Sequence, residues 1–176
     1  MITKKNGVSQ MKKLLTGFFI ALLFLGCSSK GTEQNVEPKL VVNQSLESLT
    51  LNDQNGKPHT IDANTKTIIY AFSKDVGHTC NDFFATKSDS YLAENNAIFV
   101  ADVSAAPSLI RSMFIMPGLK DFKHTVLVID DKTIAAGYKS GQNINKILIV
   151  SLHNKVITNI KAVDTTDELS KMIEAK

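Results

Sequence analysis

The sequence predicts an α/β domain in which a mixed central sheet lies between flanking helices. Three apolar, β-branched segments have the composition of strands covered on both faces: residues 67–72, 97–103 and 125–129. Buried strands of this kind, joined by helices, favour a parallel core. Two further strand segments, 144–152 and 156–163, are joined by only three residues, and so short a link makes an antiparallel hairpin. These patterns indicate a three-layer sandwich with parallel and antiparallel strands.

A β-hairpin is expected before this core. Residues 46–51 alternate roughly between apolar and polar side chains, and residues 59–61 return as a short second strand. Between them the run DQNGK, residues 53–57, contains the Asn-Gly pair that favours a tight turn. The sheet is therefore expected to begin with an antiparallel pair.

Capping signals place a first helix after the first central strand. Thr79 followed three residues later by Asp82 resembles a capping box, in which side chains satisfy the free backbone N–H groups of a helix start. This pattern predicts a loop over residues 74–79 and a helix from Cys80 to about Asn95.

A second helix is expected over residues 107–116, because proline is favoured in a first helical turn and Pro117 stands just beyond the end. Apolar side chains follow this segment at helical spacing: Leu109, Ile110, Met113, Phe114 and Met116. Such a stripe predicts packing against the core. If part of it were exposed, it would form a partner surface with adaptable methionine contacts.

The C-terminal part of the chain is expected to add one more helix. The pair at 130–131, Asp-Asp, follows the third central strand and is typical of a strand-ending turn. Residues 166–175 predict a closing helix, whose acidic start complements the positive end of the helix dipole.

The N-terminal segment has the layout of a secretory signal peptide. Lys12 and Lys13 precede an unbroken apolar run over residues 14–25, and Gly26 and Cys27 follow at once. The run is shorter than the roughly 20 residues that span a bilayer. An ordinary cleaved signal and a retained membrane helix remain alternatives.

The Gly-Cys ending resembles a bacterial lipoprotein signal. The resemblance implies that residues 1–27 are a lipoprotein signal peptide, and that Cys27 becomes the new N-terminus and carries acyl chains such as palmitate. Ser28 follows, rather than the Asp that often retains lipoproteins at the inner membrane. The expected location is therefore the cell envelope, lipid-anchored to the outer membrane and facing the periplasm.

Composition divides the remainder into a flexible tether over residues 28–45 and one folded domain over residues 46–176. Removal of residues 1–27 takes away four lysines and no acid, so 16 basic residues (20 − 4) face 17 acidic ones, a net charge near −1. Only Arg111 remains as arginine, and the lysines are scattered. This composition argues against nucleic-acid binding. The domain is expected to be a monomer that contacts the membrane through the lipid anchor.

The predicted order of elements, a hairpin followed by β-α-β-α-β and β-β-α, resembles the thioredoxin-like superfamily. Three segments resemble its peroxiredoxin and envelope thiol-disulfide oxidoreductase branch: LTLNDQNGKPHTI, TVLVIDDKTIAAGY and KILIVSLHNKVITNI. The resemblance covers residues 46–175 and implies redox chemistry at a cysteine after the first central strand.

That resemblance singles out Cys80. The run from Ser73 to Cys80 has the spacing of the peroxiredoxin pattern Pro-x-x-x-Thr-x-x-Cys, with Ser73 in place of the proline and Gly77 in place of the threonine. The implied role is a low-pKa thiolate stabilised by a helix N-terminus. His78 and Thr79 beside it, and Lys146 where the family has an arginine nearby, are the candidate binding residues. The alternative for Cys80 is a small apolar residue packed in the core.

No other constellation predicts chemistry. A Cys-x-x-Cys site would need a second cysteine at Gly77 or Phe83, so no resolving thiol is present for disulfide exchange. The four histidines, His59, His78, His124 and His153, share no metal-ligand spacing, and neither a metal nor a cofactor is expected.

The sequence thus favours a membrane-anchored envelope lipoprotein with a thioredoxin-like domain and a non-catalytic binding or accessory role. The partner would be an envelope protein or a small ligand. The alternatives are a one-Cys thiol peroxidase or oxidoreductase that uses Cys80, and a purely structural lipoprotein.

Overall fold

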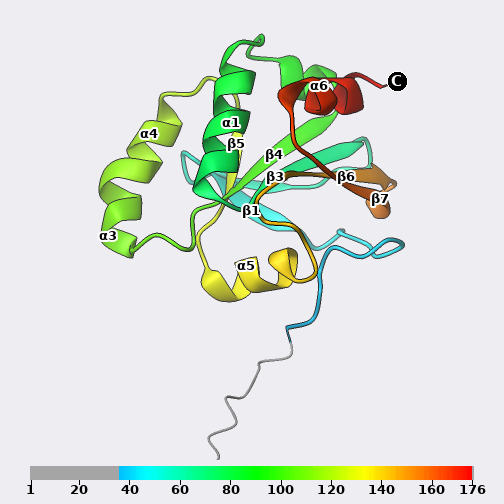
Figure 1. Ribbon diagram of the computed structural model, residues 1–176, viewed down its shortest axis with the longest axis horizontal. Coiled ribbons are helices and arrows are strands. Elements are labelled where there is room, and N and C mark those ends of the chain that lie inside the picture. The colour runs from blue at the N-terminus through cyan, green and yellow to red at the C-terminus, as the bar shows by residue number, and fades with distance from the viewer. Residues whose placement is uncertain (1–35, 176) are drawn as a thin grey trace, which may run out of the picture. The chain divides into compact units, whose positions relative to one another are not determined.

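The computed structural model describes residues 36–175, and the expected signal peptide, Cys27 and the first part of the expected tether lie outside this range. In the described part of the chain, one mixed sheet has the strand order β2-β1-β5-β4-β3-β6-β7 (Figure 1). Its strands are β1 (Thr50–Asp53), β2 (Pro58–Thr60), β3 (Thr67–Ala71), β4 (Ala97–Asp102), β5 (Val126–Ile129), β6 (Ile147–His153) and β7 (Val156–Val163). The central trio β3, β4 and β5 is parallel, and the outer strands pair antiparallel. The predicted mixed α/β sheet with its first hairpin is confirmed.

Helices cover both faces of this sheet. They are α1 (Lys74–Ala85), α2 (Tyr91–Glu94), α3 (Ser108–Ile110), the π-helix η1 (Arg111–Ile115), α4 (Met116–Lys120), α5 (Lys132–Lys139) and α6 (Thr166–Glu174). Figure 1 shows α1 and α6 above the sheet and α5 below it. None of the helices in residues 36–175 is both long and apolar enough to cross a membrane.

Alternation along the strands divides the core into two layers. Because successive side chains of a strand point to opposite faces, Ile69 and Ala71 of β3 pack with α1 and α6, whereas Ile68 and Tyr70 pack on the α5 side. All four side chains are at most 1 % exposed. The strand is thus covered on both faces, as its apolar composition predicts.

The first helix begins earlier than predicted. α1 starts at Lys74, because Ser73 adopts an extended conformation and its hydroxyl accepts the N–H of Val76. The loop expected over residues 74–79 and the capping box at Thr79 are therefore wrong, and Thr79 instead donates its hydroxyl back to the carbonyl of Asp75. The helix also ends at Ala85, well before Asn95, and the short helix α2 follows separately.

The second predicted helix continues through Pro117 instead of ending before it. Proline lacks an N–H and its ring collides with the carbonyl four residues back in a regular α-helix. The π-turn of η1, in which Met116 N–H reaches back to the carbonyl of Arg111, stands just before the proline. Pro117 then occupies the first turn of α4, where a missing N–H is tolerated. The wider turn lets a continuous helical segment run from Ser108 to Lys120.

Helix α5 is absent from the sequence prediction. The Asp-Asp pair was expected only to end a strand, but Asp131 is an N-cap whose carboxylate accepts the N–H groups of Thr133 and Ile134. These two backbone hydrogen bonds lower the pKa of Asp131. Strand β6 also begins later than expected, at Ile147, because Asn143 holds the preceding residues in a turn through the N–H of Asn145.

The tether expected over residues 28–45 is too long at its C-terminal end, because residues 36–45 pack against the domain. Leu40 is 2 % exposed and belongs to the core on the α5 side. Lys39 donates its N–H to the carbonyl of Gly137, and its ammonium lies 5.0 Å from the ring centre of Tyr138. Asn43 donates to the carbonyl of Ile157 in β7. The apolar residues that mark this attachment are too few to show periodicity in the sequence.

This attachment predicts a measurable contribution to stability. Leu40→Ala should lower the free energy of unfolding by about 2 kcal/mol, the lower end for a buried leucine, since a segment at the domain edge can partly close the cavity. Urea unfolding monitored by circular dichroism measures it. Val42→Ala is the matched control, because Val42 is 46 % exposed and should change stability by less than about 0.5 kcal/mol. Equal effects of the two substitutions would contradict the packing of this segment.

Candidate functional site

Cys80 lies inside helix α1 and not at its N-terminus. It is the seventh residue after the cap Ser73, so it stands about 10 Å along the helix axis from the free N–H groups. The stabilising field of a helix end falls off within its first turn. The Cys80 side chain is 0 % exposed and packs in the core with Val76 and Phe84.

Burial sets the acidity of this thiol. It raises the pKa of Cys80 from its ordinary value to about 12, and neither a charged group nor a hydrogen bond acts against that rise. A thiolate forms readily only where a cation, a donor or a helix end stabilises it. The geometry therefore favours the packing interpretation of Cys80 over the redox one.

The other residues singled out from the sequence do not converge on this sulfur. His78 and Thr79 precede Cys80 on the same helix but are exposed, because adjacent helical residues point in different directions. The ammonium of Lys146 lies 2.8 Å from the carboxylate of Asp164, in an exposed ion pair beside β6. Gly77, at the threonine position of the peroxiredoxin pattern, has no side chain to offer a hydroxyl. The structure thus places these residues apart.

A buried histidine, His124, contacts Asn81, the residue that follows Cys80 in α1. His124 is 4 % exposed, and its Nε2 lies 3.0 Å from Oδ1 of Asn81, so a neutral ring donates its proton to the amide oxygen. The rings of Phe84, Phe99 and Phe122 surround it. Burial lowers the pKa of His124 from its ordinary value of 6.5. This pair could not be predicted from the sequence, because His124 and Asn81 are 43 residues apart along the chain.

The lowered pKa of His124 predicts a pH-dependent stability. Above pH 6.5 the ring is neutral in both the folded and the unfolded chain, and the favourable contribution is fully present. Below pH 6.5 the unfolded chain takes up a proton that the folded chain refuses, so the free energy of unfolding falls by up to about 1.4 kcal/mol per pH unit. Urea titrations between pH 7.5 and about pH 5 should show this slope.

His124→Gln keeps a donor for Asn81 but does not titrate, and it should flatten that slope. His153→Gln is the matched control, because His153 is exposed at the end of β6. An unchanged slope in His124→Gln would show that the acid sensitivity arises elsewhere.

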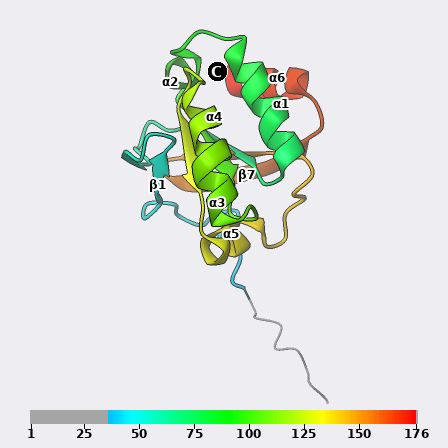
Figure 2. The ribbon, with the colours of Figure 1, turned by 90° about the vertical axis from the view of Figure 1, so that its left-hand side faces the viewer.

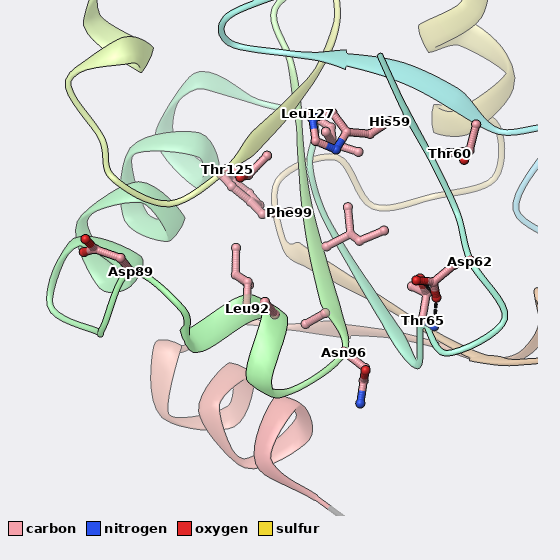
Figure 3. A pocket seen from close by; sticks show the side chains of 13 residues that line it. His59, Thr60, Asp62, Thr65, Asp89, Leu92, Asn96, Phe99, Thr125 and Leu127 are labelled. Atoms are coloured by element: carbon pink, nitrogen blue, oxygen red, sulfur yellow. Dashed lines mark hydrogen bonds between the residues drawn. The ribbon is translucent and has the colours of Figure 1, made fainter. Parts of the chain in front are cut away.

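A small cavity opens on another side of the sheet. It has a volume of about 330 Å³, and its wall includes His59, Asp62, Asp89, Leu92 and Phe99 (Figure 3). Its charged side chains are already occupied. The carboxylate of Asp62 accepts the N–H and hydroxyl of Thr65, and His59 lies 2.8 Å from Asp53. The carboxylate of Asp89 lies 3.9 Å from the ammonium of Lys123 in an exposed ion pair, so each charged side chain named in this wall already has a partner.

An ion pair lies beneath helix α5, at the C-terminal end of β4. The carboxylate of Asp102 is 1 % exposed, and Nζ of Lys139 in α5 approaches its Oδ2 to 2.7 Å. The other oxygen of Asp102 accepts the N–H of Ser104 at 2.8 Å. This pair ties the otherwise apolar contact of α5 to the sheet. This ion pair could not be predicted from the sequence, because helix α5, which carries Lys139, was not predicted.

The apolar stripe of the second predicted helix is largely exposed, and the expectation that it packs in the core is wrong for most of its members. The exposed fractions are 64 % for Leu109, 42 % for Ile110, 57 % for Met113 and 64 % for Phe114. Contact with the core is made instead by the next turns, through Ile115, Met116 and Leu119. Large apolar side chains exposed together on one surface make that surface a candidate for an interaction. The exposed set is called the apolar stripe below.

Within residues 36–175, no group of three or more His, Cys, Asp or Glu side chains is placed to hold a metal ion.

No protein-family model and no curated protein sequence matches the chain. Solved structures do. A peroxiredoxin-like protein from Aquifex aeolicus aligns with a TM-score of 0.50 and 10 % identity, covering 80 % of this chain and 90 % of the other.

The exposed lipoprotein thioredoxin of Streptococcus pneumoniae aligns with a TM-score of 0.50 and 12 % identity, covering 73 % of this chain and 98 % of the other. A putative protein disulfide isomerase from Bacteroides thetaiotaomicron aligns with a TM-score of 0.48 and 12 % identity, covering 80 % of this chain and 90 % of the other. Identities this low concern the fold alone. Together with the mixed sheet and its flanking helices, the two alignments with a TM-score of 0.50 show that this chain has a thioredoxin-like fold.

Proposed function

We propose that this chain is a lipid-anchored envelope lipoprotein whose thioredoxin-like domain has a binding or accessory role and not a redox activity. The observation that carries the proposal is the position of Cys80. Its sulfur is buried, its pKa is raised to about 12, and it is the free cysteine of the described domain. A fold of this kind hosts many functions, so the function must be inferred from the residues of the site and not from the fold.

The residues that peroxide reduction and disulfide exchange require are missing from this domain or are already paired with other groups. Reduction of a peroxide needs an accessible thiolate and donors for the developing charge on the oxygens, each worth about 2.7–4 kcal/mol of barrier. Gly77 offers no hydroxyl, and Lys146 is engaged by Asp164. Disulfide exchange needs a second thiol, and residues 77 and 83 are Gly and Phe.

The anchoring half of the proposal rests on the sequence before the domain. The charged start, the apolar run and Gly26-Cys27 are the pattern of a lipidated signal, and acyl chains on Cys27 would hold the mature chain to a leaflet. Ser28 supports the outer membrane as the site of attachment where the envelope has two membranes. The partner would be a component of that envelope.

Two measurements test the proposal. Mass spectrometry of the mature N-terminus should find an acylated Cys27, and the protein should fractionate with membranes. Consumption of hydrogen peroxide in the presence of a thiol reductant should be equally slow for the mature chain and for Cys80→Ser. An unmodified Cys27 or cleavage at another position would exclude the anchor. Fast peroxide turnover that Cys80→Ser abolishes would overturn the non-catalytic role and establish the one-Cys peroxidase instead.

A further inference from the structure

We propose that the apolar stripe docks onto the same phospholipid leaflet that holds the lipid anchor. This inference rests on the proposed acylation of Cys27. Its ligand is a lipid surface, and the docked state would hold the domain in one orientation on the membrane.

The first observation is the composition of the surface. Leu109, Ile110, Met113 and Phe114 occupy one face over two successive turns, and each is at least 42 % exposed. Residues 103–120 contain no aspartate or glutamate. An apolar helix face whose own segment carries Arg111 and Lys120 but no acidic side chain is compatible with an interface that contains anionic headgroups. Helices of this kind bury their apolar face roughly 5–10 Å into the boundary between headgroups and acyl chains.

The second observation is the short length of chain between the anchor and the domain. Val36 is already attached beside α5, where its carbonyl accepts the hydroxyl of Ser140. Nine Cα-to-Cα steps separate Cys27 from Val36 (36 − 27), so even a fully extended link spans at most about 32 Å. A folded domain of this size has a radius of gyration of about 14 Å and hence a diameter approaching 40 Å. The link is therefore shorter than the domain is wide.

The third observation is where the stripe lies relative to this attachment. Figures 1 and 2 both show α5, and the end of the long helical segment that bears α3, at the end of the domain where the described chain begins. Ile134 of α5 adds another exposed apolar side chain, 41 % exposed, at this end. Arg111 in η1 lies close enough to Asp131 at the start of α5 to contribute to lowering its pKa. The short link thus keeps the stripe near the leaflet, at high effective concentration.

The test uses the absence of tryptophan from the chain, because a substituted tryptophan is then the sole indole probe. Full-length mature, acylated protein carrying Phe114→Trp is reconstituted into vesicles of phosphatidylethanolamine and phosphatidylglycerol. A second set of vesicles contains lipids brominated near the top of the acyl chain. The expected result is blue-shifted emission that loses most of its intensity in the brominated vesicles.

The matched control is Asn159→Trp, on the exposed side of edge strand β7, which lies across the molecule from α3 in Figure 1. Its emission should stay red-shifted and unquenched. Met113→Trp is a second probe of the stripe, and circular dichroism checks that each variant is folded. Quenching of the stripe probes alone supports the proposal.

Other outcomes overturn it in distinguishable ways. Acylated protein in the membrane fraction with an unquenched Phe114→Trp would leave the proposed function standing but exclude docking. A blue shift that depends on protein concentration and not on brominated lipid would identify a second copy as the occupant, and one seen only in native envelopes would identify another protein. Absence of the acyl group would remove the anchor itself, and the proposed function would fail first.

Discussion

Cys80 should react with a thiol probe at least about 1,000-fold more slowly in the folded protein than in the denatured chain. Its pKa of about 12 lies three units above the ordinary value of 9.0, so the reactive thiolate is about 1,000-fold rarer at neutral pH. The lack of solvent access to the sulfur slows the reaction further. The chain has two cysteines, so the measurement is made on Cys27→Ser, in which Cys80 is the sole thiol. Absorbance of the released chromophore follows labelling with and without denaturant.

The neighbouring residue supplies the control for this prediction. Thr79 is exposed on the same helix, so Thr79→Cys combined with Cys80→Ala and Cys27→Ser should label rapidly in the folded state. If Cys80 reacted as fast as this control, helix α1 would have to open readily. That result would favour the alternative in which Cys80 forms a reactive thiolate and acts as a peroxidase or oxidoreductase.

Loss of the ammonium of Lys139 should destabilise the domain by about 3 kcal/mol, because Lys139→Met leaves the carboxylate of Asp102 buried without its counter-ion. The value is placed at the low end for broken buried pairs, since Ser104 N–H still satisfies one carboxylate oxygen. Chemical denaturation gives the free energy of unfolding. Adding Asp102→Asn to Lys139→Met removes the unpaired charge and should recover part of the loss.

An exposed ion pair of the same chemistry provides the comparison. Lys146→Met breaks the contact with Asp164, whose side chain is 66 % exposed, and should cost no more than about 1 kcal/mol. Similar losses for the two lysines would mean that water reaches Asp102 and that the buried pair contributes little to holding α5.

The sheet could be predicted because its signal is repeated over many residues. Each central strand consists of consecutive apolar or β-branched side chains. Because both faces of such a strand are buried, the prediction does not depend on assigning one face to the core. The hairpin of β6 and β7 was equally clear, since its short link allows one geometry. The fold class followed from this sheet, and the structure confirms it.

Helix starts were harder, because a single side chain decides each. Ser73 and Asp131 cap helices α1 and α5 by accepting backbone N–H groups, yet serine and aspartate are equally at home in ordinary turns. The error at Ser73 moved the predicted helix start by six residues and placed Cys80 at a positively polarised terminus. The observed start instead places Cys80 where the helix faces the core.

The apolar stripe was misjudged for a different reason. Helical spacing tells that apolar side chains share a face, but not whether anything covers that face. The π-turn before Pro117 changes the register of the helical segment, and Ile115, Met116 and Leu119 became its packed side. Nothing in the spacing of Leu109 or Phe114 distinguishes them from those packed residues.

The way the chain enters its domain determines how mechanical tension would spread through it. Tension applied at the N-terminus reaches the contacts of residues 36–40 with α5 first, and only then the backbone bonds of Asn43 and Leu46 to β7 and its turn. These hydrogen bonds would break one after another from the N-terminal end, and each break would lengthen the chain between Cys27 and the domain. Residues 36–46 would therefore detach from the domain before the sheet bears any force.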